Sequence, residues 1–168
     1  EGITNVKTED IRYGQELGYT LKLLAIAKRD GLQVETRVHP TFIPNDHPLA
    51  NISGSFNAVF LHGHACGEMM FMGRGAGDLP TASAIVSDLV RAASAQKHLY
   101  PTFDNEPNPA VGLQNNTNWE SAFYVRVLAQ DRPGALSHIA QTFADHDVSI
   151  KAMQQTDQRS GGHATLVF

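Results

Sequence analysis

The sequence has little of several features that would assign it to a class at once. Cys66 is its only cysteine, so it has no intrachain disulfide framework and fits a reducing compartment. Its formal net charge of −4 gives no electrostatic argument for binding nucleic acid or an anionic membrane. It has no apolar run as long as a membrane span and no signal-peptide pattern. We therefore expect a cytoplasmic protein.

Common catalytic motifs are also missing. No serine lies in a G-x-S-x-G elbow, Cys66 has no partner pattern for nucleophilic catalysis, and no lysine-bearing phosphate loop is present. The carboxylates are scattered and define no acid–base pair. From the sequence we assign no catalytic residue.

What is present is ordinary for a globular protein: 168 residues, 42% of them apolar and 18% charged, enough for one sizeable domain or two small ones. The chain begins Glu1-Gly2-Ile3 without an initiator methionine. It stops at Leu166-Val167-Phe168, inside an expected strand. We therefore expect a piece of a longer protein; the alternative is a processed or incompletely ordered chain.

The first half of the chain predicts short elements. Thr8 is a good N-cap for a helix over 9–17. Asp30-Gly31 predicts the turn of a hairpin over 20–40, whose second strand alternates apolar residues with a wet face carrying Glu35, Arg37 and His39. The prolines within 39–44 are expected to end regular pairing. The remaining elements are a helical turn near 46–51 and strands at 57–62 and 68–72.

A glycine-rich turn, Gly73 to Gly77, precedes a helix expected over 81–95. That helix carries one apolar stripe, with Pro80 in or just before its first turn; the stripe consists of Ile85, Val86, Leu89, Val90 and Ala93. Glycines before a helix N-terminus let a backbone approach a ligand closely. The G-x-G-x-G spacing is not the dinucleotide fingerprint, so a purely structural turn is the alternative.

The second half reads as a linker over 97–121 and then a β-α-β-β unit. Its strands are expected at 123–127, 148–152 and 164–168, with a turn at 160–162 and a helical stripe from Leu136 to Phe143. Asp131 to Leu136 ends the first strand and opens the helix. The N–H groups of Gly134 and Ala135 could hold a carboxylate there. The alternative is a plain turn with Asp131 as the helix cap.

One series of histidine, cysteine and glutamate residues has the spacing of metal ligands, but we do not favour a metal site there. His62, His64, Cys66 and Glu68 recur at every second position, as ligands on one strand face would. Gly63 and Gly67 interrupt such a strand, and 64–67 already reads as a turn. His39 and His47 are expected to be structural. We predict no metal site.

A series of blocks resembles the bacterial homoserine dehydrogenase family in the family's order. The blocks are Leu17-Gly18-Tyr19, Lys22 to Ala27, Arg37 to Thr41, Ile43-Pro44, His47 to Ala50, Asn57-Ala58-Val59, Gly73 to Gly77 and Pro80 to Ala84. The resemblance covers about the first 95 residues, and the tail from Ala122 looks like an ACT domain, an amino-acid-sensing module. It implies an α/β (α+β) fold: a mixed β-sheet with helices on one face, then a truncated ferredoxin-like βαββαβ unit. The implied divisions are a substrate and dimerisation domain over 1–96, the linker, and an incomplete ACT domain over 122–168.

The resemblance also implies a chemistry: NAD- or NADP-dependent interconversion of L-homoserine and L-aspartate 4-semialdehyde, in threonine, methionine and isoleucine synthesis. The family's Rossmann domain and catalytic lysine precede the matched region, so the chain alone is expected to be inactive. Cofactor contacts are implied for Gly77 first, then Gly75, Ala76 and Thr81.

For the ACT part, the resemblance implies a threonine effector at Asp131, Gly134, Ala135 and Leu136, in a site completed by another ACT unit. It also implies a homo-oligomer, because the family's sheet often forms the subunit contact. The competing hypothesis is a non-enzymatic amino-acid-sensing or dimerisation module.

Overall fold

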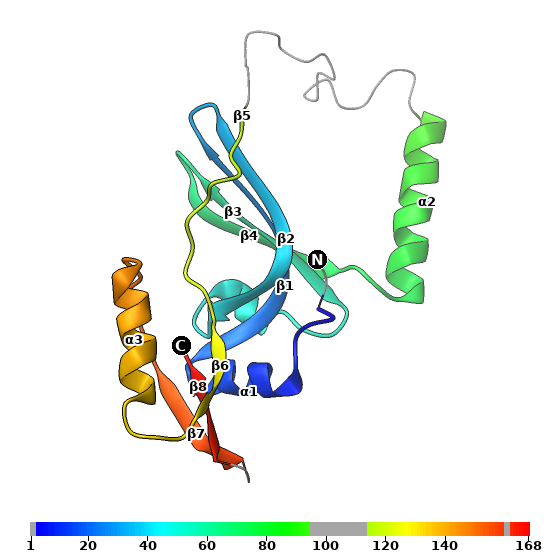
Figure 1. Cartoon of the computed structure of the whole chain (residues 1–168). Coiled ribbons are helices and arrows are strands. Elements are labelled where there is room, and N and C mark those ends of the chain that lie inside the picture. The colour runs from blue at the N-terminus through cyan, green and yellow to red at the C-terminus, as the bar shows by residue number, and fades with distance from the viewer. Residues whose placement is uncertain (1–2, 95–113, 160–161) are drawn as a thin grey trace. The chain divides into compact units, whose positions relative to one another are not determined.

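The structure of the chain is a computed structural model that describes residues 3–94, 114–159 and 162–168 (Figure 1). It divides into two compact units. The first combines Glu1–Arg29 and Val34–Pro44 with Asn115–Phe168, and the second combines Asp30–Gln33 with Asn45–Gln114.

The first unit begins with helix α1, Thr8–Glu16, which confirms the predicted helix. The prediction of Thr8 as N-cap is wrong by one residue, because Lys7 caps the helix and Thr8 is its first helical residue. The Asp10 carboxylate accepts a hydrogen bond from the Lys7 backbone N–H at 3.0 Å. A side chain in the first turn thus supplies the acceptor for a backbone N–H at the start of the helix. The helix ends before Gly18, whose φ of +85° suits glycine.

Strands β1 (Tyr19–Asp30) and β2 (Gln33–Pro44) form the predicted hairpin. β2 also pairs with β5 (Gln114–Asn115) in the order β1-β2-β5. The expectation that 39–44 leaves regular pairing is wrong, because β2 continues to Pro44. The backbone hydrogen bonds at β5 are accepted by the carbonyls of Leu32 and Val34, which precede the prolines by several residues. A proline whose missing N–H faces an edge costs the ladder nothing.

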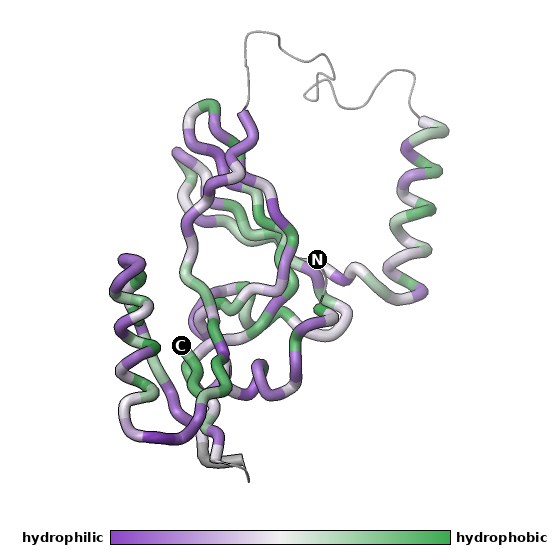
Figure 2. The backbone as a smooth tube through the Cα atoms, viewed as in Figure 1, coloured by the Kyte–Doolittle hydropathy of each residue, from purple (hydrophilic) through white to green (hydrophobic). Residues whose placement is uncertain are grey.

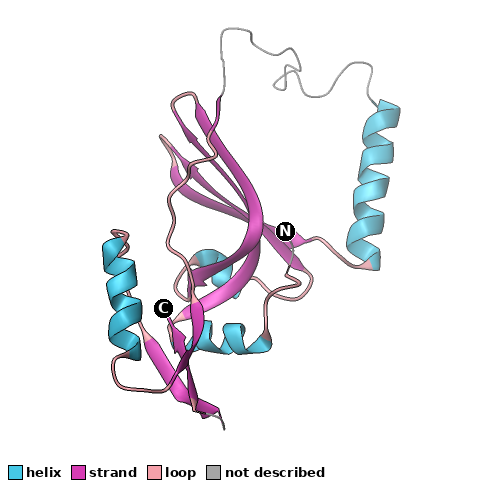
Figure 3. Cartoon of the chain, viewed as in Figure 1, coloured by secondary structure: helices cyan, strands magenta, loops and turns pink. Residues whose placement is uncertain are grey.

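The C-terminal part of the first unit forms a three-stranded antiparallel sheet with one helix. The sheet order is β6-β8-β7, as Figure 3 shows with α3 beside it. The elements are β6 (Arg126–Gln130), α3 (Ala135–Asp145), β7 (Gln154–Arg159) and β8 (His163–Val167). This confirms the predicted β-α-β-β order.

Two strand positions in this part were predicted wrongly. Residues 148–152 are not a strand, and β7 starts only at Gln154, where it pairs with Val167. Asp147 has a positive φ of 56°, so the chain turns just after α3. The strand expected at 123–127 begins three residues later, although Val125 and Phe168 already exchange two 2.9 Å backbone hydrogen bonds.

The core of the first unit lies at β8. Its central position in the sheet buries both faces, and Ala164, Leu166 and Val167 are almost inaccessible. Thr165 is buried with them, and Tyr13 of α1 is only 4% exposed. Phe143 of α3 meets Phe168 edge-on at 5.3 Å. A buried central strand explains why the short apolar run at the C-terminus was predicted well.

The second unit holds the 3₁₀ turn η1 (Pro48–Asn51), the hairpin β3 (Phe56–Gly63) and β4 (Gly67–Arg74), and helix α2 (Asp78–Ser94). These confirm the predicted helical turn, strands and helix, although α2 begins three residues early. His47 caps η1 by accepting the Leu49 N–H at Nδ1, at 3.1 Å. This is the structural role expected of that histidine.

Together these elements confirm an α/β chain in the broad sense, with the strands of the described residues in three sheets. The linker residues 97–113, the end of the predicted helix at Ala95, and residues 160–161 of the predicted turn lie outside the described residues. No helix in the part of the chain that the structure describes is long and apolar enough to cross a membrane.

Candidate functional site

The glycine turn joins β4 to α2, and it places Gly75, Ala76, Gly77 and Thr81 within one short stretch, as the sequence predicted. Gly75 has a structural reason to be glycine. Its N–H donates to the Ser55 carbonyl at 3.0 Å, and a Cβ on it would overlap the Asn57 side chain. At Gly75 the backbone therefore packs closely against another segment of the same chain, at Ser55 and Asn57.

Gly77 has a different reason. Its φ of +126° is a conformation that favours glycine. Its carbonyl accepts the Thr81 N–H at 3.1 Å, so the Thr81 N–H is already used in the first turn of α2. Ala76 and Gly77 are exposed and lie just before a helix N-terminus. Asp78 occupies the first helical position, and its negative charge disfavours a phosphate there.

Helix α2 presents its apolar stripe to solvent. No residue of α2 is buried, and the colouring by hydropathy in Figure 2 shows apolar residues recurring along this helix. The strongly exposed ones are Leu79, Ile85, Val86, Leu89 and Val90. Burying one such side chain is worth about 1.5–3 kcal/mol, so this stripe has the character of a surface that another element covers.

Of the four predicted effector residues, Asp131 and Gly134 lie in the turn between β6 and α3, and Ala135 and Leu136 begin α3; Asp131 is not the helix cap. The N-cap is Gly134, with φ +90° and no side-chain cap hydrogen bond. Ala135 donates its N–H to the Arg132 carbonyl at 3.2 Å, so a ligand carboxylate would compete for that donor. Asp131 is exposed and Leu136 is half-buried.

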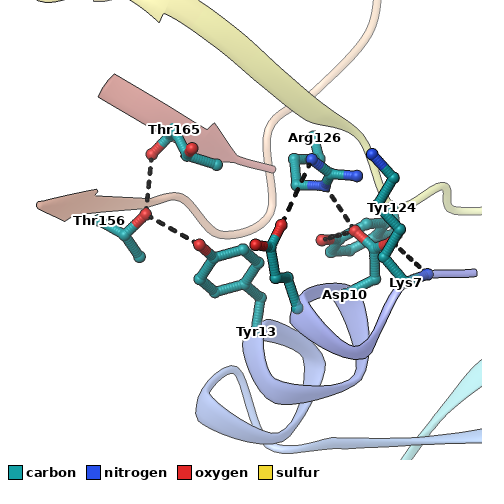
Figure 4. A network of polar contacts seen from close by, with 8 residues as sticks. Lys7, Asp10, Tyr13, Tyr124, Arg126, Thr156 and Thr165 are labelled. Atoms are coloured by element: carbon teal, nitrogen blue, oxygen red, sulfur yellow. Dashed lines mark hydrogen bonds and ion pairs between the residues drawn. The ribbon is translucent and has the colours of Figure 1, made fainter. Parts of the chain in front are cut away.

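A polar network that sequence reasoning missed joins α1 to the β6-β8-β7 sheet (Figure 4). Asp10 Oδ1 accepts hydrogen bonds from Arg126 Nε at 2.6 Å and from the Tyr124 hydroxyl at 2.9 Å. Its Oδ2 caps α1, as described above. Asp10 is 8% exposed. Its buried carboxylate thus accepts three hydrogen bonds, one from the start of its own helix and two from the segment that leads into β6.

The protonation states of this network follow from the same contacts. Burial pushes the pKa of the Asp10 carboxyl upward, but the hydrogen bonds from Lys7, Arg126 and Tyr124 and the Arg126 charge outweigh it and hold the pKa below its ordinary value. Burial, followed by the hydrogen bond to Asp10, raises the pKa of the Tyr124 hydroxyl. The hydrogen bond to Asp10 likewise raises the pKa of Arg126. The stable arrangement is an anion between a cation and a neutral phenol.

Strand register explains why α1 meets these side chains. Arg126 pairs with Val167, and Val167 pairs with Gln154, so the three share one face of the sheet. Thr156 and Thr165 form the next row on that face. The α1 residues Asp10, Tyr13 and Glu16 contact Arg126, Thr156 and Gln154 respectively.

The expected wet face of β2 is instead partly covered. The Glu35 and Arg37 side chains form an ion pair and are only 13% and 10% exposed. The Arg37 guanidinium lies 4.3 Å from the Trp119 ring centre, and His39 stacks on the same ring at 6.0 Å. The residue that covers this face comes from the segment predicted as linker, so the local alternation could not indicate it.

The histidine and cysteine series forms no ligand set. His62 and Glu68 lie on opposite strands as a cross-strand pair, and His64 and Cys66 lie in the turn between them. Within residues 3–94, 114–159 and 162–168, no group of three histidine, cysteine or acidic side chains could hold a metal ion.

Comparison with family models accounts for both ends of the chain. Residues 1–90 match the model described as homoserine dehydrogenase, and residues 123–168 match the ACT domain model. The first match contains α1, both hairpins and the glycine turn. The second contains the β6-β8-β7 sheet and α3.

Curated relatives agree with this assignment. The chain is 41% identical over 161 residues to a homoserine dehydrogenase of Neisseria gonorrhoeae and 40% identical to one of Bacillus subtilis. Each alignment covers 92% of this chain but only 37% and 36% of the relative. The chain thus spans little more than a third of the length of these proteins.

Solved structures give the same result for the fold. A homoserine dehydrogenase from Thiobacillus denitrificans superposes with a TM-score of 0.72 at 37% identity, covering 99% of this chain and 39% of that one. A homoserine dehydrogenase of S. aureus gives 0.62 at 26% identity, covering 98% and 40%.

Proposed function

Since this chain belongs to the homoserine dehydrogenase family, we propose that it works as part of an NAD- or NADP-dependent enzyme that interconverts L-homoserine and L-aspartate 4-semialdehyde. Such an enzyme would serve threonine, methionine and isoleucine synthesis in the cytoplasm. The observation that carries the proposal is the match of 1–90 to this family, followed in the same chain by an ACT match.

In this proposal the glycine turn contributes the edge of a cofactor site whose larger part lies in a nucleotide-binding domain. Gly77 is the first candidate contact, because it is exposed and its backbone conformation requires glycine. Ala76, Gly75 and Thr81 lie beside it. The bound nicotinamide supplies hydride-transfer chemistry. Asp78 would repel a pyrophosphate, so the turn suits a neutral, hydroxyl-bearing part of the cofactor.

The exposed apolar stripe of α2 also fits an enzyme whose cofactor-binding domain is a separate part of the protein. A helix that carries several exposed large apolar residues is expected to pack against another part of the enzyme. We propose that the cofactor-binding domain covers it. The catalytic proton transfer would then come from residues outside this chain, and none within it is proposed as catalytic.

We also propose that the turn from Asp131 to Leu136 takes part in threonine sensing, completed by a second ACT unit in a homo-oligomer. Gly134 supports the proposal, because its left-handed conformation shapes the turn just before α3. Calorimetry of the longer protein with L-threonine tests it. Binding should weaken in Asp131→Asn and persist in Asp145→Asn, an acidic residue at the other end of α3. Absence of threonine binding would remove this part of the proposal.

Genetic complementation tests the enzymatic proposal. The longer gene that contains these residues should restore growth of a bacterial strain lacking homoserine dehydrogenase on medium without homoserine, threonine and methionine. This chain alone should not restore it, because the family's nucleotide-binding domain is not among these residues. Failure of a well-expressed longer protein would favour the non-enzymatic sensing module instead.

A further inference from the structure

Strand β6 makes a different contact at each of its ends. At its first residue, Arg126 donates to the Asp10 carboxylate of α1 at 2.6 Å, and the Tyr124 hydroxyl donates to the same carboxylate at 2.9 Å. We call these three residues the Asp10 cluster (Figure 4). After its last residue, Gln130, the strand continues into the turn at Asp131–Leu136. One strand of five residues therefore joins the turn to α1.

This strand is hydrogen-bonded along its whole length. All five residues of β6 pair in unbroken register with β8. The turn is bonded to the same two strands. The Asp131 N–H donates to the Gly162 carbonyl, just before β8, at 2.9 Å. The Arg132 N–H donates to the Gln130 carbonyl at 3.0 Å. Because paired strands move together, a change of conformation in the turn is transmitted to Arg126.

The other contacts of α1 with the ACT sheet lie on β7. Gln154 donates to Glu16 at 2.6 Å, and Thr156 donates to the Tyr13 hydroxyl at 3.3 Å. In the sheet order β6-β8-β7, strand β7 lies beyond β8 from the turn, and its pairing with β8 is irregular between Thr156 and Arg159. A displacement of β6 therefore acts on the Asp10 cluster before it acts on these contacts.

The Asp10 cluster has two arrangements, intact or separated. The side chains of Arg126 and Asp10 are only 24% and 11% exposed. An intermediate separation leaves a buried carboxylate without its cation and is unfavourable. A small displacement of β6 therefore acts on this contact as on a switch with two states.

A ligand carboxylate at the turn requires a backbone arrangement different from the one observed. The Ala135 N–H donates to the Arg132 carbonyl at 3.2 Å, so a carboxylate that accepts this N–H must displace that carbonyl. Arg132 is itself bonded to Gln130, the last residue of β6. The displacement therefore acts on the end of β6. In the observed arrangement, the closed turn and the intact Asp10 cluster occur together.

We propose that the Asp10 cluster holds the turn in an arrangement that binds threonine weakly, and that threonine binding separates Asp10 from Arg126. The inference rests on the threonine proposal above and adds the route from the turn to the dehydrogenase region. Helix α1 is followed, after Gly18, by strand β1, so its release acts on residues of the homoserine dehydrogenase match. Because coupling between two equilibria is reciprocal, breaking the Asp10 cluster must strengthen threonine binding.

Calorimetry of the longer protein with L-threonine tests this direction. Asp10→Asn and Arg126→Gln should each lower the Kd for threonine by about fivefold or more, the size of a typical coupling. Tyr124→Phe removes one hydrogen bond and retains the ring that lies 4.9 Å from Phe42. It should shift the Kd in the same direction by less, and it serves as the test if the charge variants do not fold.

Hydrogen exchange supplies a readout that a merely structural contact would not change. In the parent protein, threonine should accelerate amide exchange at the start of α1. In Asp10→Asn, exchange there should already be fast, and threonine should add nothing to it. A protein that is only destabilised would instead bind threonine more weakly.

The contacts on β7 supply matched controls. Gln154→Met and Thr156→Val each remove a side-chain contact between α1 and the sheet and should leave the Kd for threonine unchanged. The inference is overturned if the parent binds threonine and the Asp10-cluster variants bind it equally or more weakly. It is also overturned if the β7 variants strengthen binding as much as they do. Absence of threonine binding in the parent overturns the sensing proposal and this inference together.

Discussion

Arg126 Nε on β6 donates a 2.6 Å hydrogen bond to Asp10 Oδ1 on α1, across 116 sequence positions. The two residues belong to the two regions that match different family models, yet both lie in one compact unit. The ACT sheet therefore does not stand apart from the dehydrogenase region. Its face is attached to the first helix of that region through the buried Asp10 carboxylate and through the Tyr13–Thr156 and Glu16–Gln154 contacts.

Removing this carboxylate should lower stability. Asp10→Ala leaves Arg126 and Tyr124 without their acceptor, and we expect a loss of about 2 kcal/mol in the free energy of unfolding. Asp88→Ala is the matched control, because Asp88 also lies in a helix and pairs with an arginine, but at 3.7 Å and with 77% exposure. It should change stability by less than about 0.5 kcal/mol. Urea denaturation measures both, and equal losses would contradict the role given to Asp10.

Acid should destabilise the fold through the same residue. The pKa of Asp10 is lower in the folded chain than its ordinary value of 3.8, so folding favours the anion. Its contribution is complete above that ordinary pKa and is lost as the pH falls through the lower folded value. The stability difference between the parent chain and Asp10→Asn should therefore shrink between about pH 5 and about pH 2. A difference independent of pH would contradict the assignment.

Tyr124 should behave in the opposite sense. Burial and the hydrogen bond to Asp10 raise its pKa, so folding favours the neutral phenol. That contribution is present below the ordinary value of 10.0 and is lost as the pH rises through the higher folded value. Tyr124→Phe should cost about 1 kcal/mol at neutral pH. In an ultraviolet titration of the folded chain it should also remove a phenolate signal that develops above the ordinary range. An unchanged titration curve would show that Tyr124 is not the shifted group.

Gly77 should matter for the cofactor more than for the fold. In the longer enzyme, Gly77→Ala adds a methyl group at φ +126° beside Pro80, and we expect the KM for NAD(P)⁺ to rise by about tenfold, equivalent to about 1.4 kcal/mol. Gly54→Ala also places a methyl group at a positive φ, +64°, but in open space and with a smaller backbone strain, and it should leave this KM unchanged. If both variants lose activity equally, the effect is one of folding.

Much of the fold was predictable because the information is local. The Asp30-Gly31 turn gave the first hairpin, the glycines at 63 and 67 bounded the second, and apolar spacing gave α2. The misplaced strand at 148–152 shows the limit of this reasoning. Its alternating Val148 and Ile150 look like a strand, but pairing with β8 begins at Gln154, in a polar sequence that carries no such signal.

The polar site was not predictable for a related reason. Nothing around Asp10 distinguishes it from an ordinary acidic residue in a first helical turn, since its two side-chain partners, Tyr124 and Arg126, lie more than a hundred positions away. In the same way, Glu35, Arg37 and His39 read as a wet face because Trp119, which covers them, comes from a distant segment. The glycine turn and the Asp131 turn could be located from the sequence because glycine and proline determine the backbone conformation at their own positions.

The most direct test of the enzymatic account is the initial rate of the purified longer protein in both directions. We predict formation of reduced nicotinamide that depends on L-homoserine, and its consumption that depends on L-aspartate 4-semialdehyde, with neither rate detectable for the 168-residue chain alone. L-Serine, which is one methylene shorter, should be a poor substrate. A folded longer protein that binds NAD(P)⁺ but shows no homoserine-dependent rate would contradict the account.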